Sequence, residues 1–156
     1  MYSNDIICNI LDYIDININT KISIENIEHK YSYNRYYLMR LFKKEIGITI
    51  LSYINKLRIY NSIKELNNTN NSILKVGLNN GFYSLEYFSE IFKKEIGISP
   101  REYKKITINR YYYSDKIMLK VNDNIINITE LINKTLKYKN NKKPRTIYKR
   151  ELSIFK

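Results

Sequence analysis

The heptapeptide FKKEIGI occurs twice in this chain, at 42–48 and at 92–98, with an offset of 50 residues. The match extends to tyrosines that recur at the same offset: Tyr33 and Tyr83, Tyr37 and Tyr87, and Tyr53 and Tyr103. A repeat on this scale indicates one supersecondary unit built twice. Two copies are too few for a solenoid. The repeat therefore predicts a domain with two lobes that presents the same element twice.

The first copy contains the start and stop signals of two helices. Ser23 is placed to cap a short helix that runs to about Lys30, and Asn34 is placed to cap a longer helix over 35–46. Gly47 then stands where a left-handed residue ends a helix. A short helix, a tight turn and a longer helix form the layout of a helix-turn-helix, whose second helix can lie in the major groove of DNA.

The second copy repeats this order of signals. Ser72 begins a short helix to about Asn79, and Ser84 begins a helix over 85–96 that Gly97 ends. A further helix, to about Ile106, follows the strong start signal of residues 99–102, Ser-Pro-Arg-Glu.

Two further helices complete the lobes. Ser3 caps an amphipathic helix at the N-terminus, and Thr49 caps a long helix that joins the two copies and breaks in the Asn-rich stretch 67–71. The inward side of the joining helix is expected to carry Ile50, Ile54, Leu57, Ile63 and Leu66. Other residues expected in the core are Leu38, Leu41, Phe42 and Leu51.

The last third of the chain has a different pattern. Residues 111–121 are rich in tyrosine and partly alternating, which suggests one or two strands, and 125–136 can form a helix. Residues 134–150 carry eight basic residues and no acidic one, which predicts a loosely structured segment. We therefore expect an all-α chain of about seven helices in two lobes, with a C-terminal extension that is either β/α or disordered.

The expected domain boundaries follow from these elements. Residues 1–108 form a double helix-turn-helix domain, and 109–156 form a basic extension. Within the domain, the first lobe covers about 5–48, the linker helix about 49–67 and the second lobe about 72–106.

The charge of the chain favours a polyanionic partner such as nucleic acid. The formal net charge is +12, of which residues 1–108 contribute +4 and residues 109–156 contribute +8. A basic tail that only keeps the protein soluble is the alternative.

Other classes of protein find little support. The only cysteine is Cys8, so neither a disulfide nor a cysteine-based metal site is expected. There is no catalytic constellation and no cofactor motif, so we expect neither an enzyme nor a bound cofactor. No apolar run approaches the ~18 residues of a membrane span, so we expect a cytoplasmic protein without membrane contact.

Residues 81–103 read GFYSLEYFSEIFKKEIGISPREY and resemble the signature of the AraC/XylS family of bacterial transcription regulators. That signature combines a Gly-Phe turn, a Ser-Tyr-Phe-Ser-like helix start, Phe-Lys-Lys, a glycine, Ser-Pro and a tyrosine. The first copy matches in register at Leu38, Arg40, Leu41, Phe42, Lys43, Lys44, Gly47 and Tyr53. Arg58 matches the arginine that such proteins carry in the linking helix, and the resemblance covers about residues 5–106.

The resemblance implies a DNA-binding transcription regulator. Two recognition helices, 35–46 and 85–96, would enter successive major-groove segments about 34 Å apart on one face of double-stranded DNA. The chain would bind a non-palindromic site as a monomer, associate with the nucleoid, and activate transcription through contact with RNA polymerase. Two alternatives stay open. One is a protein-interaction module of the same fold that acts on RNA polymerase or another regulator, with weak or non-specific DNA binding. In the other, 109–156 is the remnant of a ligand-sensing domain.

The register of the resemblance assigns roles in the first recognition helix. Tyr36, Met39 and Arg40 fall at base-contacting positions, and Arg40 is suited to guanine because a guanidinium can donate two hydrogen bonds to it. Asn34 and Arg35 at the helix start suit phosphates. The remaining candidates are Lys43 and Lys44, of which at least one is expected on a solvated face.

The second recognition helix departs from the family pattern. Its candidate residues are Ser84, Leu85, Glu86, Tyr87, Ser89, Glu90, Lys93 and Lys94. Glu86 and Glu90 stand where many members have Gln, Arg or Lys. Either they accept hydrogen bonds from cytosine, or the first lobe and the basic tail supply most of the affinity, which we favour. If the tail contacts phosphates, truncation after Arg110 is expected to lower the slope of log affinity against log salt concentration by several units.

Glu28 is a further departure, since an alanine is common there. It either loosens the first lobe or points outward. Gly77 keeps the corresponding position of the second lobe small.

Overall fold

The computed structural model describes residues 3–108 and 115–142, and every regular element within them is a helix. In chain order these are α1 (Ser3–Asn17), α2 (Ile24–Tyr31), α3 (Arg35–Ile46), α4 (Ile50–Asn68), α5 (Ile73–Asn79), α6 (Leu85–Ile96), α7 (Pro100–Ile108) and α8 (Asp115–Lys142). The all-α class predicted from the sequence is confirmed. The two lobes contain the seven helices expected of them, α1 to α7, and α8 lies in the C-terminal extension.

The helices of both lobes begin at the expected caps. Hydroxyl or amide oxygens accept hydrogen bonds from backbone N–H groups of the first turn at Ser23, Asn34, Thr49, Ser72 and Ser84. Gly47 and Gly97 end α3 and α6 with the same positive φ of 96°, which favours glycine. The heptapeptide repeat therefore encodes the second half of each long helix and its stop.

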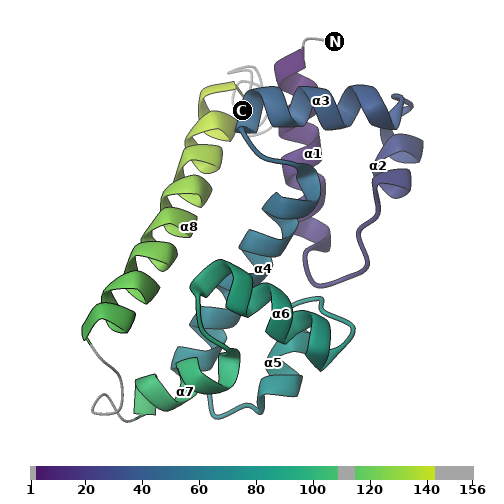
Figure 1. Cartoon of the computed structure of the whole chain (residues 1–156). Coiled ribbons are helices and arrows are strands. Elements are labelled where there is room, and N and C mark those ends of the chain that lie inside the picture. Colours follow the sequence, from purple (N-terminus) through teal and green to yellow (C-terminus); the bar gives the residue numbers. More distant parts are fainter. Residues whose placement is uncertain (1–2, 109–114, 143–156) are drawn as a thin grey trace, which may run out of the picture.

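Each lobe has its own core, and α4 contributes to both (Figure 1). In the first lobe, isoleucines of α1 pack against Leu38 and Phe42 of α3. In the second, the ring of Phe88 lies 5.0 Å from that of Phe82 and 5.7 Å from that of Phe92. A Cβ at Gly77 would lie 2.9 Å from the Phe88 ring, so this position is confined to a small residue.

One predicted core residue lies on the surface. Leu51 is 61% exposed, because the first turn of α4 buries Ile50 and turns Leu51 outward. Leu41 is half-buried and packs against the core of the first lobe.

A buried arginine joins the two lobes. The Arg58 guanidinium, on α4, donates to the carbonyl oxygens of Ile18 at 2.9 Å and Thr20 at 2.7 Å, both in the first lobe. The same group lies 5.8 Å from the centroid of the Phe82 ring in the second lobe. A Cβ at Gly81 would lie 2.6 Å from the Ile18 carbonyl oxygen, so a glycine with φ of 82° lets the two backbones approach here.

The structure predicted for the C-terminal extension is wrong in two of its three parts, within the residues that the structure describes. Residues 115–121 are helical rather than strands, and 134–142 are helical rather than loosely structured. The helix expected over 125–136 is confirmed as part of α8. Residues 111–114 and 143–150 of these predictions lie outside the described part of the chain.

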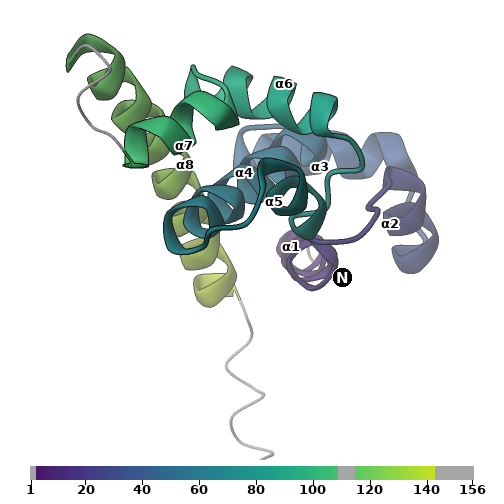
Figure 2. The ribbon, with the colours of Figure 1, turned by 90° about the horizontal axis from the view of Figure 1, so that it is seen from below.

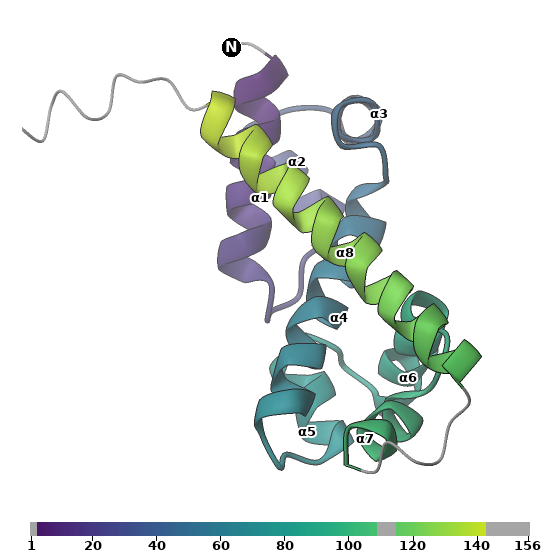
Figure 3. The same cartoon turned by 90° about the vertical axis from the view of Figure 1, so that its left-hand side faces the viewer.

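Helix α8 runs back along the molecule from the second lobe to the first (Figures 1 and 3). Val121, Ile128 and Ile132 are buried in the core that α4 and α6 share, and Leu131 and Tyr138 pack against the core of the first lobe. Burial on one side explains why α8 is a helix, since an amphipathic face gains most of its stability from packing. The basic segment is in this part an integral piece of the fold.

Candidate nucleic-acid interface

The two long helices that the repeat predicts, α3 and α6, lie on the same side of the molecule. Both cross the front in Figure 1, and both lie at the right in Figure 3. Seen from below, α4 lies between α6 and α1, so α1 is on the opposite side (Figure 2). One face therefore presents both helices, and the first turns of α8 reach the same side next to α6 (Figures 2 and 3).

The exposed side of α3 contains the residues that the sequence assigned to it. Leu38, Phe42 and Ile46 are buried and fix the inward side. Arg40 is two residues from both Leu38 and Phe42, and at 3.6 residues per turn this places it on the opposite side. All the candidate residues of this lobe are exposed: Asn34, Arg35, Tyr36, Met39, Arg40, Lys43 and Lys44. Within residues 3–108 and 115–142, Arg40 has no ion-pair partner.

Arg35, predicted to contact phosphate, is already paired inside the lobe. Its guanidinium lies 3.2 Å from a Glu25 carboxylate oxygen and 3.6 Å from one of Glu28. The backbone N–H of Arg35 also donates to Glu28 at 3.1 Å. Glu28 does not simply point outward, because its carboxylate lies at the N-terminus of α3. A negative charge there meets the positive end of the helix dipole, where an anion such as phosphate can bind.

The second reading helix presents a different charge. Glu86 and Glu90 are exposed at the positions that correspond to Tyr36 and Arg40. Leu85, Tyr87, Lys93 and Lys94 are exposed as well, whereas Ser84 and Ser89 are half-buried. Ser84 accepts the backbone N–H of Tyr87 at 3.1 Å, so it acts as a helix cap. The repeat thus carries an arginine at the centre of one exposed face and a glutamate at the centre of the other.

Tyr87 of α6 also contacts residues behind the exposed face. Its hydroxyl oxygen accepts a hydrogen bond from the buried Asn55 side chain of α4 at 3.2 Å, and its ring centroid lies 6.0 Å from that of Phe82. The Asn55 side-chain oxygen is buried without a partner in the described residues. Tyr87 therefore also ties α6 to the linker helix, which the sequence did not indicate.

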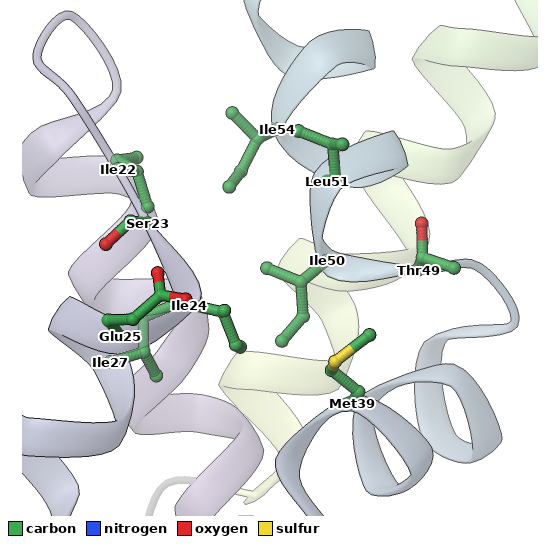
Figure 4. A pocket seen from close by; sticks show the side chains of 10 residues that line it. All are labelled: Ile22, Ser23, Ile24, Glu25, Ile27, Met39, Thr49, Ile50, Leu51 and Ile54. Atoms are coloured by element: carbon green, nitrogen blue, oxygen red, sulfur yellow. The ribbon is translucent and has the colours of Figure 1, made fainter. Parts of the chain in front are cut away.

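A groove lies beside each reading helix. In the first lobe it has a volume of about 440 Å³, and Figure 4 shows Met39 reaching into it from α3. Its lining is mostly apolar and comprises Ile22, Ser23, Ile24, Glu25, Ile27, Met39, Thr49, Ile50, Leu51 and Ile54. Met39 is therefore partly engaged with its own lobe and faces the first turn of α4.

The groove of the second lobe has the same volume, about 440 Å³, and a more polar lining. Leu85 and Ser89 of α6 line it together with Ser99, Pro100 and Arg101 at the start of α7. Arg101 corresponds in the repeat to Leu51, and it is exposed. This cation could not be predicted from the sequence, because its counterpart Leu51 was expected in the core.

Within 3–108 and 115–142, no group of three or more His, Cys, Asp or Glu side chains could hold a metal ion. In the same residues, no helix has the length and apolar character needed to cross a membrane.

This chain is similar in sequence and in structure to known proteins. Residues 28–106, from α2 to α7, match the family model described as "Helix-turn-helix domain". The chain is 31% identical over 118 residues to the HTH-type transcriptional activator AarP of Providencia stuartii, which covers 76% of this chain and 85% of AarP.

Solved structures give the same result. The C-terminal domain of AraT, a response regulator from Geobacillus stearothermophilus, superposes with a TM-score of 0.64 at 25% identity, over 70% of this chain and 92% of that one. A transcriptional regulator of Chromobacterium violaceum, described among AraC-type DNA-binding domain-containing proteins, has a TM-score of 0.60 at 28% identity, over 69% of this chain and 96% of its own.

Proposed function

This chain belongs to the AraC-type helix-turn-helix family of sequence-specific DNA-binding transcription regulators, and on that premise we propose that it activates transcription from a two-part DNA site. In this proposal α3 and α6 enter successive major-groove segments about one helical turn apart. The observation that carries it is the placement of two equally capped, exposed helices on one face.

We propose unequal roles for the two helices. Arg40, central and without an ion-pair partner in the described residues, reads a guanine, with Tyr36 and Met39 beside it. Asn34, Arg35, Lys43 and Lys44 contact phosphates. In α6 the carboxylates of Glu86 and Glu90 oppose phosphates and accept only bases that offer a donor, such as cytosine. Most of the affinity then comes from the first lobe, and α6 contributes selectivity.

The cations around Glu86 and Glu90 in this proposal are Lys93 and Lys94 of α6 and Arg101 of α7. Ser84, Leu85, Tyr87 and Ser89 complete the surface that faces DNA. In this proposal residues 1–108 form the domain that reads DNA. Helix α8 supports this domain by packing against the cores of both lobes.

The name of one relative supports a proposal about regulation. AarP is described as a transcriptional activator, and the chain covers 85% of its length. We propose that this chain likewise activates, as a monomer on DNA, by contact with RNA polymerase. As a regulator of bacterial type it would act in the cytoplasm at the nucleoid.

The test of DNA binding is an electrophoretic shift assay on genomic fragments with excess competitor DNA. Specific complexes are expected to persist, and log Kd is expected to rise linearly with log salt concentration. Binding that the competitor removes completely would instead support a module that acts on another protein.

Glu28→Gln is expected to raise affinity for the specific site. The change removes a negative charge at the N-terminus of α3 and releases Arg35 from one of its two carboxylate partners. The expected gain is about two- to fivefold, with a salt slope larger by about one. Glu65→Gln is the control, because Glu65 binds asparagines of the second lobe away from α3. If Glu28→Gln leaves the affinity unchanged, the ion pair between Arg35 and Glu28 does not reduce DNA binding.

A further inference from the structure

Helix α8 contacts the C-terminal ends of both recognition helices. In the first half of α8, the Asn124 side chain donates a hydrogen bond to the Ile96 carbonyl oxygen, in the last turn of α6, at 2.9 Å. Near the other end, the Tyr138 hydroxyl donates to the Glu45 carboxylate, in the last turn of α3, at 3.2 Å. One rigid helix therefore joins the same point of two elements whose spacing decides which DNA they fit.

The attachment to the second lobe is mainly apolar. Val121, Ile128 and Ile132 are each no more than 8% exposed and lie in the core with α6. Asn124 lies against Gly97, where a Cβ would be 3.4 Å from its side-chain nitrogen. This end of α8 is fixed by burial and moves with the second lobe.

The attachment to the first lobe combines the packing of Leu131 and Tyr138 with several polar contacts. Thr135 shares a buried hydrogen bond of 3.1 Å with Tyr53 of α4. The Lys139 ammonium lies 2.6 Å from carboxylate oxygens of both Asp12 and Asp15 of α1, and its side chain is only 12% exposed. Burial and the neighbouring Glu45 raise the pKa of Tyr138 to about 12, so its hydroxyl stays protonated and can donate.

Within residues 3–108 and 115–142, two connections besides α8 join the lobes. These are the single helix α4 and the contacts of Arg58 and Gly81. Both lie along or beside α4, so a bend in α4 changes the separation of α3 and α6. Helix α8 is attached to both lobes and resists such a bend, because its length cannot change.

We propose that α8 is a brace that fixes the spacing and relative orientation of α3 and α6, and so makes the protein selective for the number of base pairs between its two half-sites. Thr135, Tyr138 and Lys139 are then positioning residues that determine spacing specificity without touching DNA. The inference rests on the proposed reading of a two-part site. It adds a second layer of specificity, because base contacts select each half-site and α8 selects the distance between them.

The scale of the effect follows from DNA geometry. Each inserted base pair moves one half-site by about 3.4 Å and turns it by roughly a tenth of a turn. A braced protein can follow such a change only if the DNA deforms, which carries an energetic cost. A protein with a released first lobe can follow by bending at α4.

The experiment begins with a target selected from random DNA by the wild-type full chain. Variants of this target with one base pair added to or removed from the spacer are then titrated with three proteins. These are wild type, the double variant Tyr138→Phe/Lys139→Met and the single variant Lys137→Met. Lys137 is exposed on α8 two residues from Lys139, so Lys137→Met is matched to Lys139→Met in charge.

Wild type and Lys137→Met are expected to lose about tenfold or more in affinity on the altered spacers. The double variant is expected to lose less than about threefold, with unchanged base preference in each half-site. Equal loss by all three proteins would overturn the brace. Failure of wild type to select any two-part target would instead overturn the proposed function. If circular dichroism shows the double variant unfolded, Tyr138→Phe alone, which removes one hydroxyl, decides by the same comparison.

Discussion

Replacing Ile128 by alanine is expected to lower the free energy of unfolding by about 2–5 kcal/mol, the range for deleting a large buried aliphatic side chain. Ile128 lies on α8 and is 3% exposed in the core that α4 and α6 form. Ile126 is on the same helix and is 51% exposed, so Ile126→Ala is expected to cost less than about 0.5 kcal/mol. The two substitutions remove the same atoms from positions two residues apart.

Urea denaturation followed by circular dichroism measures both values. A similar small cost for the two variants would show that α8 does not pack on the lobes in solution. The comparison matters because domains are stable by only about 5–15 kcal/mol, so the larger value is a sizeable share of the total. It also explains why truncation after Arg110 is a poor test of the basic charge, since it removes Val121, Ile128 and Ile132 from the core.

Arg40→Ala is expected to weaken binding to the specific DNA target by about 1–3 kcal/mol, or roughly 5- to 150-fold, and to relax base preference at one position. Arg40 projects from the centre of the exposed side of α3, opposite Leu38 and Phe42. A guanidinium there can donate two parallel hydrogen bonds to guanine, which lysine cannot reproduce. Arg40→Lys is therefore expected to retain phosphate attraction and still lose the base preference.

The repeat supplies a matched control for Arg40. Glu90 occupies the same position in α6, and Glu90→Ala is expected to change preference only in the other half-site. Titration of the variants on targets with each base substituted gives both profiles. A uniform loss across all sequences for Arg40→Ala would reassign Arg40 to a phosphate contact.

The first seven helices could be predicted because their signals are local. A cap such as Asn34 and a stop such as Gly47 act through the backbone of their own helix, so the sequence reveals them directly. The duplication supported each assignment a second time. The exposed sides of α3 and α6 followed from the spacing of buried residues on the same helices.

Helix α8 was predicted poorly because its signal competes with others. Met118, Val121, Ile125, Ile128 and Ile132 recur at alternating steps of three and four, which is a helical pattern. The run of tyrosines before it suggested strands, and the basic residues after it suggested disorder. Their charge does not prevent helix formation where, as at Lys139, carboxylates of another helix are nearby.

The pairing within the candidate interface could not be predicted, because it depends on tertiary contacts. Arg35 meets Glu25 and Glu28 only when α2 and α3 fold against each other, and Tyr87 meets Asn55 across two helices. Exposure and residue type predicted which side chains reach the surface. They did not show which of these the protein itself already engages.

If α3 and α6 read two different half-sites, a single chain has an asymmetric target. Selection of bound sequences from random double-stranded DNA by the full chain measures this. We expect a single asymmetric motif in two parts, with centres about 10–10.5 base pairs apart. A palindrome, a single half-site or the absence of any enriched sequence would contradict it.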